Sequence, residues 1–402
     1  MPISTDNLLL LLKRSDELRA LVDGLRNIGY SSQAVANAFG MKESPRDLLT
    51  NTAYCALAYY DAARASSSPV AVLGAMFSCG GWIEKSVYER TIPAHIRAPL
   101  GSCGLVLEAA GNFVRASVGL HEFGSQWIFS DALLERSPSQ LRLAQDFPEH
   151  VDPPNYSSLS LLRNIMIQRQ HDRRILDIGC GSGIQSIVAA KSYSSVVGID
   201  VTERTMAFSK LNASVNDVAA AFQKCDCMSF QESEQFDRIL FNCPSVPRYR
   251  RDLDKIDTYT SPMGHELVIK FLQERLEALL SPVGIAEIWS IFAVEKRVGS
   301  VADLLVGSVQ CLNHCDVEIV VEANSPFGLS RRQITERSIP RNSFLLASPD
   351  DAGRLLAFVH DRQIDHIAPA LVRIQRRVET RGRLRLREVE TLLQSPQVTN
   401  NS

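Results

Sequence analysis

The run Ile175-Leu176-Asp177-Ile178-Gly179-Cys180-Gly181-Ser182-Gly183 constrains the fold more than any other part of the chain. A short apolar segment of strand character leads into three closely spaced glycines, and helical spacing begins at Ile184. Glycines allow a sharp turn and let a ligand approach backbone N–H groups without interference from a Cβ atom. The start of the next helix favours negative ligand charge. The run therefore predicts a strand–turn–helix unit that binds a ligand through its turn.

Strand-like and helical segments alternate from Arg174 to about Ala347. Continuous apolar strands that alternate with helices indicate a mostly parallel sheet covered on both faces. The late strands 317–321 and 344–347 are joined by a polar stretch too short for a crossover helix, which indicates an antiparallel edge. We therefore predict an α/β fold with a Rossmann-like, doubly wound, mostly parallel sheet. The other expected strands are 175–178, 196–199, 238–241 and 286–291, and the expected helices are 184–191, 203–212 and 266–280.

The N-terminal part of the chain has a mainly helical pattern. Apolar residues recur there at helical spacing, and glycines and serines lie where helices would end and begin. The β-like runs 113–118 and 126–129 flank two glycines, as the strands of a hairpin do. Helices followed by a hairpin predict a winged-helix-like accessory domain. The expected helices are 8–28, 31–39 and 51–65.

The segment Pro148–Tyr156 holds three prolines and few apolar residues, which indicates a domain boundary. We expect an accessory domain over residues 1–147, the ligand-binding domain over 148–350 and an arginine-rich C-terminal extension over 351–402. Within that extension, the alternation in Arg383-Leu384-Arg385-Leu386-Arg387 predicts a strand with one solvated face. Acidic residues lie nearby, so surface salt bridges are expected there ahead of RNA contacts.

Composition excludes several classes of protein. Lys and Arg number 43 and Asp and Glu 45, so the net charge of −2 provides no general basic field for a polyanion. Nine irregularly spaced cysteines do not form a disulfide framework, and the pair Cys225 and Cys227 lacks the partners of a metal site, so we expect no metal. The apolar run Leu8–Leu12 is too short for a secretory signal or a membrane span. These observations predict a cytoplasmic protein without a membrane partner.

Two nucleotide-type ligands compete for the glycine-rich turn. A nicotinamide or flavin dinucleotide prefers the spacing Gly-x-Gly-x-x-Gly, whereas this turn reads Gly-x-Gly-x-Gly. A carboxylate at Asp177 would repel a pyrophosphate but favours the sulfonium and ammonium groups of S-adenosylmethionine. Asp200, at the end of the next strand, can accept hydrogen bonds from the ribose hydroxyls of either ligand. The pattern therefore predicts S-adenosylmethionine as the cofactor.

With these residues, the chain resembles the class I S-adenosylmethionine-dependent methyltransferases over roughly residues 150–300. The runs 200–212 and 236–242 resemble the branch that holds the release-factor glutamine methyltransferases and the small RNA-guanine N-methyltransferases, and the N-terminal layout resembles relatives with a helical accessory domain. The resemblance implies that Asp226 accepts a hydrogen bond from the adenine amino group and that Cys227 offers its backbone N–H to the ring. The expected cofactor-binding residues are Asp177, Gly179, Cys180, Gly181, Gly183, Asp200, Val201, Asp226, Cys227 and Asn242.

The fourth expected strand ends in the turn Asn242-Cys243-Pro244-Ser245, where the branch usually has Asn-Pro-Pro followed by Tyr or Phe. There the Asn oxygen and the next carbonyl accept hydrogen bonds from a planar NH₂ group, and the aromatic ring stacks on it. Ser245 removes a stacking contact worth about 1–3 kcal/mol in comparable sites. Alignment of the nucleophile with the methyl group is the main requirement, so no base is needed. We expect Asn242, Pro244 and Ser245 to be catalytic and Tyr156, Tyr249 and His265 to bind substrate, with Tyr156, Tyr249 or Tyr259 as a replacement stacking ring.

The loss of the stacking ring leaves room for a small, nonplanar acceptor. We therefore expect methyl transfer to a nitrogen or oxygen of a small metabolite. Two alternatives stay open: N-methylation of a protein or an RNA, and a non-methyl use of S-adenosylmethionine. The latter is aminocarboxypropyl transfer, or cyclisation to azetidine-2-carboxylate, with release of methylthioadenosine. The oligomeric state also stays open.

Overall fold

The computed structural model divides the chain into two compact units. The first comprises Met1–Ser158, Ile175–Phe230 and Lys255–Asp257, and the second comprises Leu159–Arg174, Gln231–Asp254 and Thr258–Ser402. These units differ from the predicted domains, whose limits stay a prediction. The structure describes residues 3–39, 67–132, 134–136, 141–143, 149–165, 173–249, 261–309, 312, 314–322, 325, 327–339, 345, 351–377 and 383–389.

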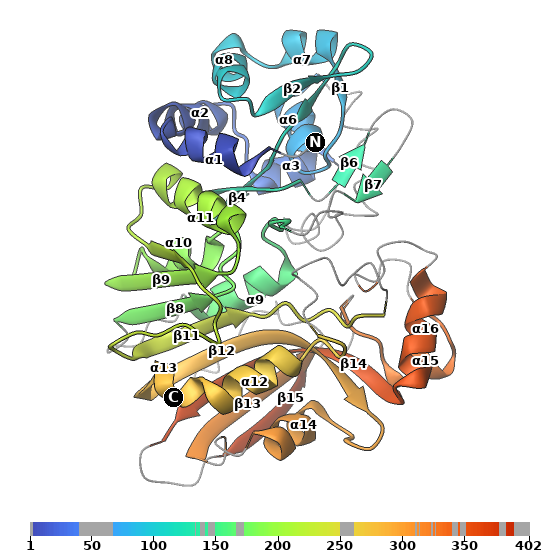
Figure 1. The fold of residues 1–402 in the computed structure, drawn as a ribbon. Helices are drawn as coiled ribbons and strands as arrows, with labels where there is room; N and C mark the ends of the chain where they lie inside the picture. Colours follow the sequence, from blue (N-terminus) through green and yellow to red (C-terminus); the bar gives the residue numbers. More distant parts are fainter. Residues whose placement is uncertain are drawn as a thin grey trace, which may run out of the picture. The chain divides into compact units, whose positions relative to one another are not determined.

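One large sheet confirms the predicted α/β class. Its strands are β8 (Arg174–Ile178), β9 (Ser195–Asp200), β10 (Ala221–Lys224), β11 (Phe236–Asn242), β12 (Leu280–Glu295), β13 (Cys315–Glu322), β14 (Ile364–Arg376) and β15 (Leu384–Val389). Their order is β10-β9-β8-β11-β12-β14-β13-β15 (Figure 1). β9 and β10 are parallel, as are β11 and β12, whereas β14 is antiparallel to both of its neighbours. The sheet is therefore mostly parallel with an antiparallel part, as the sequence predicts.

The antiparallel partner of β13 is not the expected segment 344–347. β14 pairs with β13 and β12, and of the expected segment only Leu345 belongs to the described residues. Both β14 and β15 come from the region predicted as a C-terminal extension. The strand at 383–387 was predicted and corresponds to β15, whereas β14 was not predicted although its buried residues alternate along the strand. Ala370, Val372 and Ile374 are buried.

The arginines of this region form ion pairs across the strands of the second unit. Arg387 of β15 lies 3.3 Å from Glu318 of β13, which confirms the predicted strand with a surface salt bridge. Residues 384–388 are all exposed, however, so the strand does not have the single solvated face that was predicted. Deeper in the sheet, Glu287 of β12 pairs with Arg373 at 2.9 Å and with Arg238 of β11 at 3.4 Å. Arg238 and Glu287 are fully buried. Buried ion pairs of this kind tolerate the loss of one partner poorly.

The N-terminal part of the first unit is helical with a small sheet. Its helices are α1 (Thr5–Leu12), α2 (Ser15–Asn27), α3 (Ser32–Ala38), α6 (Pro69–Phe77), α7 (Lys85–Thr91) and α8 (Ala94–Ser102). Its small sheet has the order β1-β3-β2, from β1 (Ile83–Glu84), β2 (Val106–Ala109) and β3 (Phe113–Ala116). The order α6, β1, α7, α8 and then the β2–β3 hairpin is that of a winged helix. The expected helix over 8–28 is two helices, and the expected helix over 51–65 lies outside the described residues.

The predicted pairing of 113–118 with 126–129 is wrong. β3 pairs with β1 and β2, whereas β5 (Gln126–Ser130) pairs with β4 (Gly119–Phe123). The β4–β5 hairpin closes at Gly124 and Ser125, which have φ angles of 49° and 79°. Two successive positive φ angles are the signature of the tight hairpin turn that suits twisted strands. A further hairpin joins β6 (Leu134–Arg136) and β7 (Leu141–Leu143).

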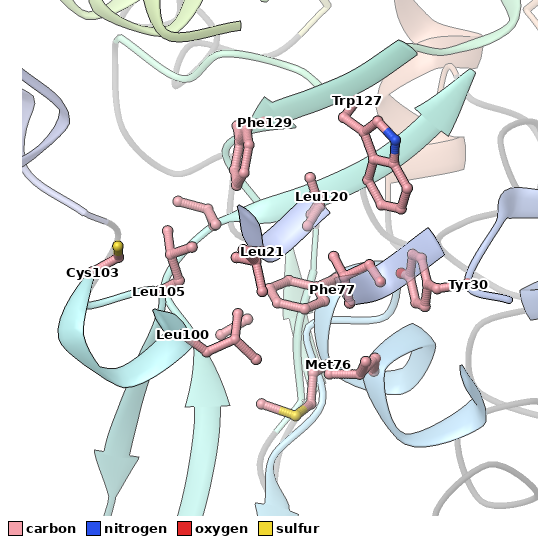
Figure 2. Close-up of a cluster of buried hydrophobic side chains, with 14 of the residues drawn as sticks. Leu21, Tyr30, Met76, Phe77, Leu100, Cys103, Leu105, Leu120, Trp127 and Phe129 are labelled. Carbon is pink, nitrogen blue, oxygen red and sulfur yellow. The ribbon is translucent and has the colours of Figure 1, made fainter. Parts of the chain in front are cut away.

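The first unit has a continuous apolar core. Phe77 of α6 and Leu120, Trp127 and Phe129 of the β4–β5 hairpin belong to it (Figure 2). The core continues into α11 (Glu203–Val215) through residues such as Phe208. α1 and α2 pack on α11. The N-terminal helices therefore share their apolar core with the strand–helix part that follows them.

The remaining helices alternate along the chain with the strands of the large sheet. They are α9 (Tyr156–Ile165), α10 (Ile184–Ala189), α12 (Glu266–Glu274), α13 (Leu276–Leu279), α14 (Val301–Ser308), α15 (Arg331–Thr335) and α16 (Asp351–Asp361). Within the second unit, α12, α13 and α14 lie in front of the strands β12, β13 and β15 in Figure 1. Among the described residues, none of the helices has the length and apolar character needed to cross a bilayer.

Candidate cofactor site and acceptor turn

The glycine-rich turn adopts backbone angles that explain its glycines. Gly179, Gly181 and Gly183 have φ angles of 65°, 53° and 83°, a region that other residues rarely occupy. A Cβ atom on Gly183 would lie 3.3 Å from Ser209 of α11, so the turn also approaches that helix closely. The N–H of Cys180 donates to the Ile199 carbonyl at 3.0 Å, which ties the turn to β9.

Side chains of α11 hold the carbonyl groups of the same turn. Ser209 Oγ donates to the Gly181 carbonyl at 2.8 Å. Asn212 Nδ2 donates to the Ser182 carbonyl at 2.8 Å. Both side chains are fully buried. Ser209 and Asn212 were not among the predicted site residues, although both lie in the run 200–212 on which the family resemblance rests.

Asp177 presents a buried carboxylate oxygen beside the turn. Its Oδ2 atom accepts from the Ser186 N–H at 3.0 Å and from the Ser186 hydroxyl at 2.6 Å. Within the described part of the chain, its Oδ1 atom has no hydrogen-bond partner. Burial raises the pKa of Asp177 to about 7. A cationic group of the ligand would both pair with Oδ1 and favour the ionised form, which fits the ammonium group of S-adenosylmethionine.

Asp200 links the end of β9 to the glycine-rich turn. Its Oδ2 atom accepts from the Gly181 N–H at 3.1 Å, and its Oδ1 atom accepts from the Val201 N–H at 2.7 Å. Burial raises the pKa of this carboxyl as well. The Val201 side chain is 46% exposed although it is apolar. An exposed apolar side chain next to the predicted ribose ligand offers a surface on which a flat ring can pack.

The predicted adenine-binding residues follow β10 in the same unit. Asp226 is exposed, and its Oδ1 atom accepts from the Met228 N–H at 2.8 Å. Cys227 is buried, and burial raises the pKa of its thiol to about 12, so the thiol stays neutral. Their roles toward adenine remain a prediction. Within the described residues, no cluster of three or more His, Cys, Asp or Glu side chains offers a metal site.

The acceptor turn at the end of β11 belongs to the second unit and is held by backbone bonds. The Cys243 N–H donates to the Trp289 carbonyl at 3.1 Å, and Ser245 Oγ accepts from the Ile291 N–H at 2.9 Å. A Cβ atom on Gly264, whose φ is 86°, would overlap the Ser245 carbonyl oxygen. Ser245 is therefore a support of the turn, because its hydroxyl oxygen is engaged with β12.

An aromatic pair lies beside Asn242 in the sheet register. Asn242 is the register partner of Trp289, so both side chains leave the sheet on the same side. The Trp289 ring packs edge-on against Phe327, with 5.5 Å between ring centroids. Within the described residues, the indole N–H of Trp289 has no hydrogen-bond acceptor. Sequence spacing gave no sign of this pair, since only strand pairing brings Trp289 to Asn242.

The predicted substrate-binding residues are more enclosed than the sequence suggests. Tyr156 is buried at the start of α9, and the Tyr249 hydroxyl donates to the Leu345 carbonyl. His265 is 5% exposed, and its ring stacks on Phe292 with 5.9 Å between centroids. Burial lowers the pKa of His265, which favours its neutral form. Tyr259, the third candidate for the replacement stacking ring, lies outside the described residues.

Comparison with known proteins places the chain in a family. The model of the methyltransferase small domain family matches residues 152–255. A putative protein N5-glutamine methyltransferase of Methanocaldococcus jannaschii is 32% identical over 148 residues, which are 35% of this chain and 72% of the relative. The chain belongs to the class I S-adenosylmethionine-dependent methyltransferases.

Two further relatives match shorter stretches of this methyltransferase. The release factor glutamine methyltransferase of Flavobacterium psychrophilum is 31% identical over 120 residues, or 29% of this chain and 41% of the relative. The ribosomal protein L11 methyltransferase of Dictyoglomus turgidum is 41% identical over 108 residues, or 27% of this chain and 36% of the relative. The chain thus spans less than half the length of these two relatives.

The cofactor of this methyltransferase is S-adenosylmethionine, and the residues of the first unit fit it. The unpartnered Oδ1 atom of Asp177 suits the ammonium group, and the exposed Val201 side chain suits the base. When bound, S-adenosylmethionine supplies an electrophilic methyl group. The individual cofactor contacts and the catalytic roles of Asn242, Pro244 and Ser245 remain predictions.

Proposed function

We propose that this methyltransferase transfers a methyl group to a side-chain amide nitrogen of a protein. The observation that carries the proposal is the likeness to the Methanocaldococcus jannaschii relative, which the chain covers over 72% of that relative's length. That relative's name describes methylation of protein glutamine, and the release factor and L11 relatives are also named for protein targets. This favours the protein alternative over the small metabolite first expected.

The acceptor turn offers what a primary amide requires. An amide NH₂ group has two N–H donors, and both must be satisfied when the group leaves water. The side-chain oxygen of Asn242 and the carbonyl of Cys243 are two acceptors at neighbouring positions. Support from Ser245 and Gly264 keeps the turn in one conformation. A fixed turn can align the nitrogen with the methyl group, which is the main demand of this reaction.

The aromatic pair Trp289 and Phe327 compensates for the ring that is missing at Ser245. An amide is planar, so an aromatic face beside Asn242 stabilises it by stacking. The indole N–H of Trp289 is also a donor for the carbonyl oxygen of an amide. A small nonplanar amine would use neither property. The neighbourhood of Asn242 therefore supports an amide acceptor.

The winged-helix part gives little support to a nucleic-acid substrate. In such folds the second helix of the helix–turn–helix enters the groove, and here that helix is α8. α2 packs on α8, with a Cβ position on Gly24 only 3.5 Å from Ile96. Arg14 next to α2 also donates to the Ser102 carbonyl at the end of α8. One side of α8 is therefore occupied by the protein itself.

The proposal is tested by following a labelled methyl group. The purified protein is incubated with S-adenosylmethionine labelled in its methyl group and with cell extract, and the products are treated separately with protease and with ribonuclease. We expect label that protease releases and ribonuclease does not, and methylglutamine after enzymatic digestion of the labelled protein. Label in RNA or in the small-molecule fraction would contradict the proposal, as would methylthioadenosine as the by-product.

An Asn242→Ala variant tests the acceptor turn separately from cofactor binding. It removes one acceptor for the amide and leaves the first unit unchanged, so we expect cofactor affinity within a few-fold of wild type and labelling reduced by at least about a hundredfold. Calorimetry measures the affinity and label incorporation measures turnover. An unaltered rate would remove Asn242 from the acceptor site.

A further inference from the structure

Two asparagines of α11 bind the outer edge of the β4–β5 hairpin in the manner of a partner strand. Asn212 Oδ1 accepts from the Phe129 N–H, and Asn212 Nδ2 donates to the Phe129 carbonyl, both at 2.8 Å. Asn216 repeats the arrangement on Trp127, with its Oδ1 atom at 2.8 Å from the N–H nitrogen and its Nδ2 atom at 2.7 Å from the carbonyl. On the edge of β5 that faces away from β4, the backbone N–H and carbonyl groups of Trp127 and Phe129 are therefore hydrogen-bonded to side chains.

The spacing of helix and strand explains why two asparagines suffice. Residues four apart on a helix are separated by about 6 Å along its axis, and residues two apart on a strand by about 6.7 Å. Asn212 therefore lies opposite Phe129 and Asn216 opposite Trp127. These are alternate residues of β5 whose backbone groups point away from β4. The contact fixes both the position and the register of the hairpin on α11.

Asn212 has a second contact that Asn216 lacks. Its Nδ2 atom also donates to the Ser182 carbonyl of the glycine-rich turn at 2.8 Å. The corresponding second bond of Asn216 Nδ2 goes to the Asn212 carbonyl at 2.8 Å, within α11. One fully buried amide group therefore bonds the N-terminal hairpin with one hydrogen and the cofactor turn with the other.

We propose that Asn212 is a positioning residue that couples the β4–β5 hairpin to the cofactor turn, so that docking of the hairpin sets the affinity for S-adenosylmethionine. The two bonds to Phe129 fix the plane of the Asn212 amide. With that plane fixed, the remaining hydrogen points at the Ser182 carbonyl and holds the turn between Gly181 and Gly183. This assigns a role to the N-terminal part of the chain, and it does not depend on the identity of the methyl acceptor.

The coupling must act in both directions. If docking of the hairpin strengthens cofactor binding, then cofactor binding strengthens docking of the hairpin by the same factor. Arg204 of α11 also bonds to the N-terminal part through two groups: its Nε atom donates to Asp131 at 2.8 Å, and its Nη1 atom donates to the Ile3 carbonyl at 2.6 Å. These bonds do not reach the turn, so they hold the hairpin without coupling it.

The first test compares Asn212→Asp with Asn216→Asp. Each substitution keeps the size of the side chain and replaces its donor group by an oxygen, so both variants weaken the hold on β5. Only the change at 212 also removes the donor to Ser182. By calorimetry we expect S-adenosylmethionine binding to weaken about tenfold in N212D and to stay within about twofold of wild type in N216D. Equal weakening in both variants, or wild-type affinity in N212D, would overturn the proposal.

A second test uses the wild-type chain and so stands even if N212D does not fold. Hydrogen exchange is measured on the segment that carries the Trp127 and Phe129 amides, with and without S-adenosylmethionine. Reciprocal coupling predicts slower exchange of the Phe129 amide with cofactor bound, by about the same factor as the affinity change. Unchanged exchange at Phe129 with cofactor bound would overturn the proposal.

Discussion

The cofactor turn after β8 and the acceptor turn after β11 follow strands of the same sheet but are built by different means. The cofactor turn carries its ligand groups in its own neighbourhood, with Asp177 before it and Asp200 at the end of the next strand. The acceptor turn owes its shape to distant residues, because Gly264 gives it room and Ile291 bonds to Ser245. The two turns therefore differ in their binding groups, which are local to the cofactor turn. The shape of each turn depends on residues outside it, which are Ser209 and Asn212 for the cofactor turn and Gly264 and Ile291 for the acceptor turn.

The largest expected effect is from Gly264→Ala, which tests whether the acceptor turn depends on a residue outside it. The new Cβ atom would overlap the Ser245 carbonyl at a φ of 86°, so the turn must shift. A shift of about 1 Å at such a site lowers turnover roughly a hundredfold. We expect label incorporation to fall by that factor while cofactor affinity stays within a few-fold. Gly353→Ala is the control, because its Cβ position in α16 has no atom within 4 Å.

The next effect is expected from Asp200→Ala, which tests the local character of the cofactor turn. The substitution removes the acceptor of the Gly181 N–H and the predicted acceptor of the ribose hydroxyls. Loss of hydrogen bonds to a charged group costs about 2 kcal/mol, so affinity should fall by roughly 30-fold. Calorimetry measures this directly. Retained affinity would show that Asp200 supports the turn without binding the cofactor.

The smallest expected effect is the dependence of cofactor affinity on pH that the Asp177 carboxyl produces. Its pKa is raised to about 7, so the carboxyl is neutral in acid and ionised in base. Only the ionised form attracts the cationic cofactor, and affinity should therefore rise as the pH increases from about 6 to about 8. In Asp177→Asn this rise should disappear while any titration of the cofactor itself remains. An equal rise in both proteins would exclude Asp177 as its source.

The sequence predicted those parts of the molecule that adjacent residues define. The glycine-rich turn, its two aspartates and the strands on either side of it form a contiguous pattern, so their placement follows from local chemistry. The short helix expected over residues 31–39 was predictable for the same reason, and it is present as α3 with Ser31 as its N-cap. The fold class followed from the alternation of strands and helices alone.

The parts of the fold and of the site that could not be predicted depend on strand pairing and long-range hydrogen bonds, which no local sequence pattern shows. Residues 113–118 and 126–129 look like one hairpin, yet each forms a hairpin with a different strand, because turns at Gly111 and Gly124 both have positive φ. Asn212 looks like a surface helix residue until β5 is placed against it. Trp289 reaches Asn242 only through the register of β11 and β12. Long-range hydrogen bonding decided all three.

The antiparallel insertion of β14 has a consequence for how the chain is made. β12 already has β11 as a partner on one edge, but its other edge and the facing edge of β13 are paired only when residues 364–376 arrive between them. Until then both strands expose unpaired backbone edges, which invite association with other chains. On the ribosome, closure of this part of the sheet therefore waits until residues 364–376 have emerged. Shortening the chain before residue 376 would leave two nascent strands as permanent sites of aggregation.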